Sequence, residues 1–423
     1  MMEENKKDLD RLFALIYTVL GYGFVYLFTG GTFAPGIAAF TVCYILTILA
    51  YLFIKKVKPA PESWFWMIVI LSSGMFYNRW SIFPLLQFIG LIVAAAYWTL
   101  TATGNLIEEG RTSSFVFYDG LNAFIIVPFR NFFCHFNILI HGSRDFGHSE
   151  NKFGRGVWPV VLGIIISIPV LVVILPLLSS ADSQFEGITE YLYSFIGNHV
   201  GDFFMRLLLS LPVTAYLFGL VYGGIHHKNT DHFSEDTIRG SAAHLRTLPD
   251  TAVHTVNTIM ALVYLLFIAI QGRYLFSAFA GIRPEGFTFS EYARRGFFEL
   301  CVIAVINLVI LIVSNSFSKN PFQENVWLKR ETVLLSALTI LLLATAMSKL
   351  LLYISAYGLT ELRVLSLTFL IWMFLVFLLI IISRYKNIPL VRISVIAGAV
   401  LFCLLCAIPI SKCIKQYNLI FHY

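Results

Sequence analysis

The amino-acid sequence predicts an all-α polytopic membrane protein, and three observations carry this prediction. The 423 residues are 58% hydrophobic and only 13% charged, which is about half the charged fraction of an average soluble domain. Their mean hydropathy is +0.78. Runs of about 20 apolar residues, the length that crosses a hydrocarbon core of about 30 Å, recur along the chain. Short alternating segments of the kind that build a β-barrel do not stand out.

These runs predict about 11 transmembrane helices. A charged segment, Met1–Arg11, precedes the first run, and no small-residue cleavage site follows that run. The first run is therefore predicted to be a retained span and not a removed signal peptide. The predicted spans are residues 12–29, 36–54, 63–78, 81–103, 157–178, 203–225, 252–272, 296–315, 331–353, 364–383 and 390–410.

The distribution of basic residues predicts the orientation. If the N-terminus is inside, the inner segments contain most of the 30 Lys and Arg residues. The loop at residues 179–202 has acidic residues but no Lys or Arg, as an outer loop can have. Because cytoplasmic loops are enriched in Lys and Arg, we expect the N-terminus inside and the C-terminus outside. The net charge of +6 is explained by the same bias and does not indicate nucleic-acid binding.

The sequence predicts three segments. Residues 1–103 form an N-terminal four-helix membrane segment, and residues 157–423 form a C-terminal seven-helix membrane domain. Between them, residues 104–156 form a cytoplasmic or interfacial amphipathic segment, because aromatic residues mix there with sparse charge. A re-entrant segment is the alternative for this middle part.

The motifs of several enzyme classes are missing. The sequence contains no phosphate-binding loop, no His-Glu-x-x-His zinc helix and no Gly-x-Ser-x-Gly nucleophile elbow. It therefore predicts no catalytic residue, no cofactor and no metal site, and an enzyme is less favoured than a binding protein. Histidines of two predicted inner groups lack compact metal-ligand spacing and are expected to be solvated loop residues. These are His135, His141, His148, His226, His227, His232 and His244.

A Gly-x-x-x-Gly pattern, Gly219 to Gly223, lies in the span predicted at residues 203–225. Small residues at this spacing let a neighbouring helix approach closely. The neighbour is either another helix of the same bundle or a second copy of the chain, and the sequence leaves both open.

The main candidate for a functional site lies at the predicted outer edge of the membrane. Glu291, Arg295 and Glu299 are spaced i, i+4 and i+8, so their side chains share one helix face, with Arg294 beside them. Arg273 ends the preceding span on the same side. Basic residues on the outer side run against the positive-inside bias. They therefore predict a pocket for an anionic lipid headgroup, a phosphate-bearing lipid carrier or a carboxylate substrate.

A second group of candidates follows in the next span. Lys349 lies inside it, and Tyr353 and Tyr357 follow at i+4 and i+8 as aromatic walls of the predicted pocket. Gly358 is expected to end this helix and Thr360 to cap the next one. The full candidate set is Arg273, Arg294, Arg295, Glu299, Lys349, Tyr353, Tyr357, Glu361 and Arg363.

A structural alternative explains the same charges. Arg295 with Glu299, and Glu361 with Arg363, could be self-contained ion pairs that fix helix ends. Lys349 would then extend its ammonium group to the membrane surface. The sequence does not decide between the pocket and these local pairs.

Two of these stretches resemble a known family. They are Glu291-Tyr-Ala-Arg-Arg-Gly-Phe-Phe-Glu-Leu300 and Tyr353-x-x-x-Tyr-Gly-Leu-Thr-x-x-Arg363, with Gln416-Tyr-Asn418 near the end. They resemble a bacterial family of multi-pass membrane proteins that is catalogued as a domain of unknown function. The resemblance covers about residues 250–420. It implies a bacterial plasma membrane and no particular activity.

Three functions are compatible with these features. The first is a transporter or lipid-carrier-like protein that uses the outer-face pocket. The second is a non-catalytic membrane sensor or scaffold that works with a membrane protein partner. The third is a transferase that acts on a lipid-linked substrate, for which Glu299 and Glu361 are acids near the interface. The expected partners are the lipid bilayer and an anionic lipid or small anionic substrate.

Overall fold

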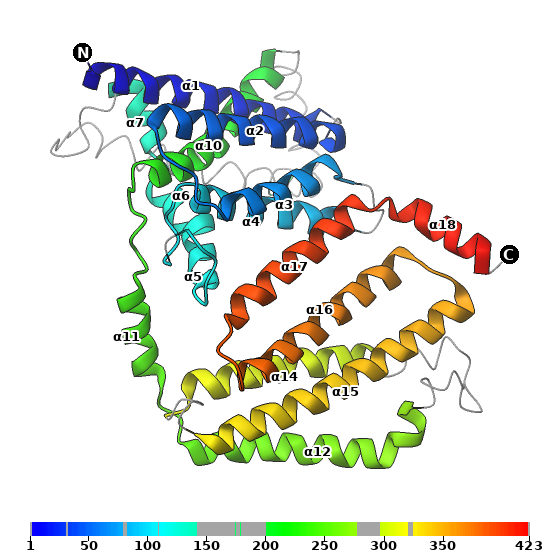
Figure 1. Cartoon of the computed structure of the whole chain (residues 1–423). Coiled ribbons are helices and arrows are strands. Elements are labelled where there is room, and N and C mark those ends of the chain that lie inside the picture. The colour runs from blue at the N-terminus through cyan, green and yellow to red at the C-terminus, as the bar shows by residue number, and fades with distance from the viewer. Residues whose placement is uncertain are drawn as a thin grey trace. The chain divides into compact units, whose positions relative to one another are not determined.

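The computed structural model describes residues 2–30, 33–78, 83–108, 110–141, 200–276, 297–319 and 325–421, together with Ile174 and Leu178. All named elements in these residues are helices (Figure 1). One isolated bridge joins Leu248 and Ser318. The predicted all-α membrane class is confirmed.

Ten segments of the described chain are long and apolar enough to cross a membrane. All but one coincide with a predicted span. The exception is Val116–Ile140, which falls in the segment predicted to be cytoplasmic or interfacial. The predicted span at 63–78 is a helix of 13 residues, α3 (Ser63–Met75), which is short for a full crossing. The predicted span at 157–178 lies outside the described residues.

The described chain divides into two compact units. Unit 1 comprises Met1–Met75, Ile92–Gly110 and Asp119–His232, and unit 2 comprises Phe76–Leu91, Arg111–Tyr118 and Phe233–Tyr423. The predicted division at residues 104 and 157 stays a prediction, because the second boundary and the span after it lie outside the described residues.

Unit 1 is built on α1 (Met2–Thr29), which packs against α2 (Phe33–Lys55) and α10 (Val200–Ile225). Its remaining helices are α3, the second half of α4 (Pro84–Ala102), η1 (Asn122–Ile126), α6 (Val127–Arg130), α7 (Cys134–His141) and part of α5 (Val116–Leu121).

The Gly-x-x-x-Gly pattern of α10 is an internal packing contact of unit 1. A Cβ at Gly219 would lie 2.9 Å from the carbonyl oxygens of Pro128 and Asn131. A Cβ at Gly223 would lie 2.4 Å from Nδ2 of Asn131. Only glycine lets the backbone of α10 approach α6 so closely, which favours the first of the two neighbours considered from the sequence.

The segment from α5 to α7 packs polar side chains into unit 1. Asn131 is fully buried, and its Nδ2 donates to the carbonyl oxygen of Lys228 at 2.8 Å. His135 is 1% exposed and its Nε2 lies 3.1 Å from both Thr18 Oγ1 and the carbonyl oxygen of Ala14. The expectation that His135 is a solvated loop residue is therefore wrong. It lies on a helix that folds back against α1, where a backbone carbonyl replaces water as its partner.

Unit 2 contains α11 (Glu235–Leu245), α12 (Asp250–Phe276), α14 (Phe297–Phe317) and α15 (Val326–Tyr357), followed by α16 (Glu361–Ser383), α17 (Leu390–Ala407) and α18 (Ile410–Phe421). α15 packs against α12, α14 and α16. The core of the unit lies where these helices meet and includes Ala304, Leu343, Ala346, Leu370 and Phe377.

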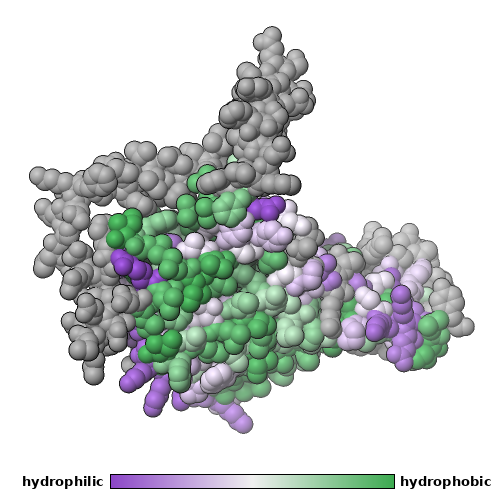
Figure 2. Space-filling model, turned by 90° about the horizontal axis from the view of Figure 1, so that it is seen from above, coloured by the Kyte–Doolittle hydropathy of each residue, from purple (hydrophilic) through white to green (hydrophobic). Residues whose placement is uncertain are grey.

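Apolar side chains also cover the outside of the helices. Figure 2 shows them over much of the described surface on the face in view. On α14 the exposed residues include Val302, Val305, Ile306, Val309 and Ile312. Lipid chains are the solvent that an apolar surface of this extent requires.

Contacts within each unit join residues that the distribution of basic residues assigns to one side of the membrane. In unit 1, Asp10, Lys55 and His226 meet, and in unit 2, His254 meets Glu331. All five positions belong to, or border on, segments predicted to be inner. The relative sidedness of these helix ends is therefore consistent with the prediction, whereas the orientation of the chain in the membrane stays a prediction.

Candidate functional site

Polar side chains line one side of α15, the central helix of unit 2. They are Glu331, Thr332, Ser336, Thr339 and Lys349, which we call the polar face of α15. All except Glu331 are at most 1% exposed. Eighteen positions separate Glu331 from Lys349, which is about 27 Å at the rise of an α-helix and close to the thickness of the hydrocarbon core. The polar face therefore has an end near each membrane surface and a middle at mid-membrane depth.

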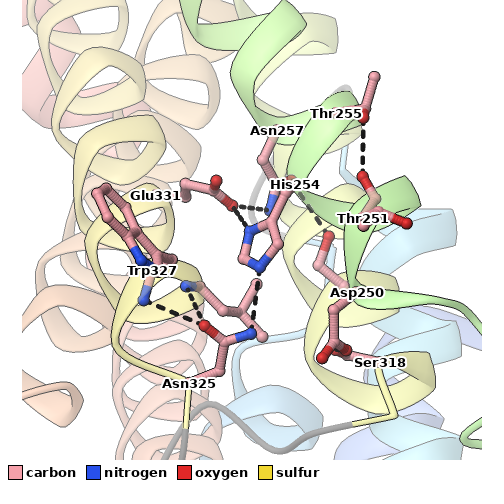
Figure 3. Close-up of polar contacts among 11 residues, drawn as sticks. Asp250, Thr251, His254, Thr255, Asn257, Ser318, Asn325, Trp327 and Glu331 are labelled. Atoms are coloured by element: carbon pink, nitrogen blue, oxygen red, sulfur yellow. Dashed lines mark hydrogen bonds and ion pairs between the residues drawn. The ribbon is translucent and has the colours of Figure 1, made fainter.

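At the first end, the carboxylate of Glu331 is held by α12 (Figure 3). Its Oε2 lies 2.8 Å from Nδ1 of His254 and 3.4 Å from Nδ2 of Asn257. The Oδ1 of Asn257 in turn accepts a hydrogen bond of 3.2 Å from Ser314 on α14. The carboxylate of Glu331 and the amide of Asn257 thus link α15, α12 and α14 by hydrogen bonds.

The cap of α15 determines the tautomer of His254. Asn325 precedes the helix, and its Oδ1 accepts the backbone N–H groups of Trp327 and Leu328, both at 3.1 Å (Figure 3). Its Nδ2 must therefore face Nε2 of His254, 3.1 Å away. Because Nδ2 can only donate, Nε2 accepts, and the ring proton lies on Nδ1, where it is donated to Glu331.

In the middle of the polar face, three helices share a buried hydrogen-bond chain. The hydroxyl of Tyr264 on α12 donates to Oδ1 of Asn307 on α14 at 2.7 Å. Nδ2 of Asn307 donates to Oγ1 of Thr339 at 2.9 Å, and Thr339 donates to the carbonyl oxygen of Leu335. Interhelical bonds of this kind fix the register of membrane helices.

Two hydroxyls of the polar face differ from this pattern. Thr332 Oγ1 and Ser336 Oγ are fully buried and have no hydrogen-bond partner among the described residues. They lie between the Glu331 end and the Asn307 chain. Buried polar groups normally have a hydrogen-bond partner. These two hydroxyls can therefore still donate and accept hydrogen bonds that the described side chains do not supply.

At the second end, Lys349 is 1% exposed and lies within the helical core of unit 2. The carboxylate of Glu299 acts on it electrostatically. Glu299 belongs to the first turn of α14 and is itself exposed. The structure therefore brings two of the predicted site residues, Glu299 and Lys349, near each other.

Four more predicted residues surround the junction of α15 and α16. Arg363 lies over the ring of Tyr353, 3.9 Å from its centroid, and donates to the carbonyl oxygens of Tyr357 and Gly358. The rings of Tyr353 and Tyr357 are in contact. Glu361 accepts a hydrogen bond of 3.3 Å from Ser411 on α18. The guanidinium of Arg363 thus stabilises the carboxyl end of α15.

At the same junction, the stretch around Gly358 contacts the stretch around Asn418, which lies about 60 residues later in the sequence. Gly358 ends α15 with a φ of 77°, a conformation that favours glycine. Asn418 on α18 holds the next residue, Leu359, by accepting its N–H at 2.7 Å and donating to its carbonyl oxygen at 3.1 Å. Thr360 is the N-cap residue of α16, but its side chain makes no capping hydrogen bond. The expected helix end at Gly358 is confirmed, and Thr360 has the expected cap position without the capping hydrogen bond.

Three predicted site residues stay without a described side chain. Arg294 and Arg295 lie outside the described residues, and of Arg273 only the helical backbone is described. The predicted pocket therefore stays a prediction. Sequence reasoning missed His254, Asn257 and Glu331, although two polar residues at i and i+3 inside an apolar run are a signal for a buried polar contact.

Unit 1 contains a second buried charged cluster. Asp10 is 3% exposed, and its Oδ1 lies 2.6 Å from Nζ of Lys55 and accepts a 2.7 Å hydrogen bond from Tyr51. Nε2 of His226 lies 3.5 Å from Oδ2. The ring of His226, which lies exposed in the turn after α10 as expected from the sequence, contacts that of Tyr222. Among the described residues, no three His, Cys, Asp or Glu side chains gather as a metal site.

These features define a polytopic α-helical membrane protein with polar side chains buried inside its helical units. The chain belongs to the family described as a domain of unknown function (DUF4153), which matches residues 65–420. The resemblance noted for about residues 250–420 is thereby confirmed, and the match begins much earlier in the chain. No curated protein and no solved structure matches it.

Proposed function

We propose that this protein is a membrane carrier that binds an anionic group at the Lys349 end of the polar face of α15. The observation that carries the proposal is the burial of Lys349, which is 1% exposed on a membrane-spanning helix. A charged side chain inside a span is costly and is retained mainly where it serves a substrate or ion pathway. An ammonium group offers three donors to a phosphate or carboxylate.

The exposure of Glu299, whose carboxylate acts on Lys349, supports a mechanism in which an external anion replaces this carboxylate. Glu299 is exposed and belongs to a different helix, so a carboxylate or phosphate from outside can take its place beside the ammonium group. Tyr353 and Tyr357 supply aromatic walls, with Arg363 and Glu361 at the rim. We include Arg273, Arg294 and Arg295 in the proposed pocket because of their place in the sequence.

The proposed ligand is an anionic lipid headgroup or a small soluble anion, since both present the same charged oxygens. We place the protein in the bacterial plasma membrane. In this location a lipid headgroup would reach the pocket from the outer leaflet, and a soluble anion would reach it from water.

The experiment measures ligand retention by the purified full-length protein. Native mass spectrometry counts bound phosphatidylglycerol, and thermal shift with inorganic phosphate tests the soluble source. Lys349→Met keeps the volume and removes the charge, and it is expected to abolish whichever signal the native protein shows. Lys415→Met on the exposed face of α18 is the matched control and should leave the signal unchanged. Equal binding by native protein and Lys349→Met would refute the proposal.

A further inference from the structure

Asp119 is a buried carboxylate in unit 1 that lacks the partners other buried charges have. It lies on α5 and is fully buried. Its Oδ1 accepts the backbone N–H of Ile107 at 2.9 Å. Its Oδ2 is buried and has no hydrogen-bond partner among the described residues. A buried carboxylate without a compensating positive group is costly.

Asn122 places a second unused acceptor one turn further along. Its Nδ2 donates to the carbonyl oxygen of Thr230 at 3.2 Å. This bond fixes the amide orientation, because a flipped amide would set two acceptors against each other. Its Oδ1 is therefore an acceptor, and it too is buried with no partner among the described residues. Residues spaced i and i+3 on a helix have Cβ atoms about 5–6 Å apart on one face.

The backbone and the neighbouring charges add to this picture. Asn122 begins η1, a π-helical stretch, and such stretches in α-helices occur frequently at functional sites. Glu108 adds like charge near Asp119, and Asp231 accepts a hydrogen bond from the side chain of Thr230. The described surroundings of Asp119 are therefore electronegative.

The donor atoms select the class of ligand. Carboxylate and amide oxygens suit hard cations, whereas transition metals favour nitrogen or sulfur ligands. One buried carboxylate matches a single positive charge. Asp119 also lies in the first turn of Val116–Ile140, a segment long and apolar enough to cross a membrane, and an uncompensated charge in such a segment is costly.

We propose that Asp119 Oδ2 and Asn122 Oδ1 are ligands of a binding site for a monovalent cation, with Na⁺ as the ion. The site belongs to unit 1 and does not depend on the anion pocket proposed for unit 2. In a carrier, a bound cation of this kind is the element that couples transport to an ion gradient.

The test is the thermal stability of the purified full-length protein in NaCl and in choline chloride at equal ionic strength. Na⁺ is expected to raise the Tm of the native protein by about 5 °C, because a ligand that binds only the folded state stabilises it. Asp119→Asn keeps the shape and removes the charge, and it should eliminate this shift. Asp236→Asn, which alters an exposed carboxylate in the first turn of α11, should preserve it.

Each other outcome overturns the proposal. An equal Tm of the native protein in both salts rules out a Na⁺ site. A shift that persists in Asp119→Asn removes Asp119 from the site. If Asp119→Asn fails to fold, the binding of ²²Na⁺ to the native protein and to Asn122→Ala tests the site. Asn122→Ala is expected to bind less ²²Na⁺ than the native protein, and equal binding would contradict the proposal. If Na⁺ does not change the Tm of the native protein and Asp119→Asn has a higher Tm than the native protein, a bound proton and not Na⁺ neutralises the carboxylate of Asp119.

Discussion

Lys55 and Lys349 are both lysines on membrane helices, Lys55 partly buried and Lys349 buried, and the acidic groups that act on them differ. In unit 1, the ammonium group of Lys55 lies 2.6 Å from Asp10, whose side chain is only 4% exposed. In unit 2, Lys349 is 1% exposed, and the carboxylate that acts on it, Glu299, is exposed. The ion pair of Asp10 with Lys55 is therefore closed to the surroundings, whereas the carboxylate that acts on Lys349 is open to them.

The difference separates a structural pair from a candidate binding group. The carboxylate of Asp10 also bonds Tyr51 and contacts His226, so four side chains from α1, α2 and the turn after α10 satisfy one another. An outside anion would have to break all of these contacts. The carboxylate that acts on Lys349 is exposed, and an exposed charge contributes little to stability.

The largest expected effect comes from opening the closed pair. Lys55→Met leaves the carboxylate of Asp10 buried without its closest cation, and removal of one partner of a buried pair costs about 3–5 kcal/mol. The Tm of the purified protein measures the loss. Lys56→Met changes the adjacent exposed lysine and should leave the Tm nearly unchanged. Equal effects of the two substitutions would show that Lys55 has no structural role.

A smaller effect is expected at the N-terminal end of α15. Asn325→Ala removes the cap of the helix and the donor that faces Nε2 of His254, and loss of a cap costs about 1 kcal/mol. Asn325→Asp keeps an oxygen for the cap and loses the donor. Thermal unfolding should rank the native protein first, Asn325→Asp second and Asn325→Ala last. The opposite order of the two variants would mean that repulsion between the Asp carboxylate and Nε2 of His254 outweighs the cap.

The smallest effect has the opposite sign. Glu299→Gln removes the internal competitor for Lys349, so the affinity for an anionic ligand should rise by about two- to fivefold. Titration of phosphatidylglycerol or inorganic phosphate, whichever the native protein binds, measures this change. A loss of affinity would show that Glu299 supports the ligand and does not compete with it.

Sequence reasoning predicted the class and most helices because a backbone in lipid must satisfy its own hydrogen bonds, which leaves long apolar helices as the solution. It also predicted the end of α15 at Gly358, since that signal is local. The segment from α5 to α7 was harder to place, because its polar residues Asn131 and His135 resemble a solvated face until their partners on other helices are known.

The candidate site shows the same limit. Burial of Lys349 and its proximity to Glu299 depend on how α14 packs against α15, which composition and spacing do not determine. The contact of His254 with Glu331 joins positions 77 residues apart. Both residues stand near the ends of apolar runs, where charge is common, and the spacing of His254 and Asn257 at i and i+3 was the one local signal of a buried contact.

The central claim is that Lys349 binds an external anion in competition with Glu299, and a double-mutant cycle tests it most directly. The measurement is the anion affinity of the native protein, Glu299→Gln, Lys349→Met and the double variant. We expect higher affinity in Glu299→Gln, no binding in Lys349→Met and no binding in the double variant. Retained binding in Lys349→Met, or a gain from Glu299→Gln that survives without Lys349, would contradict this account.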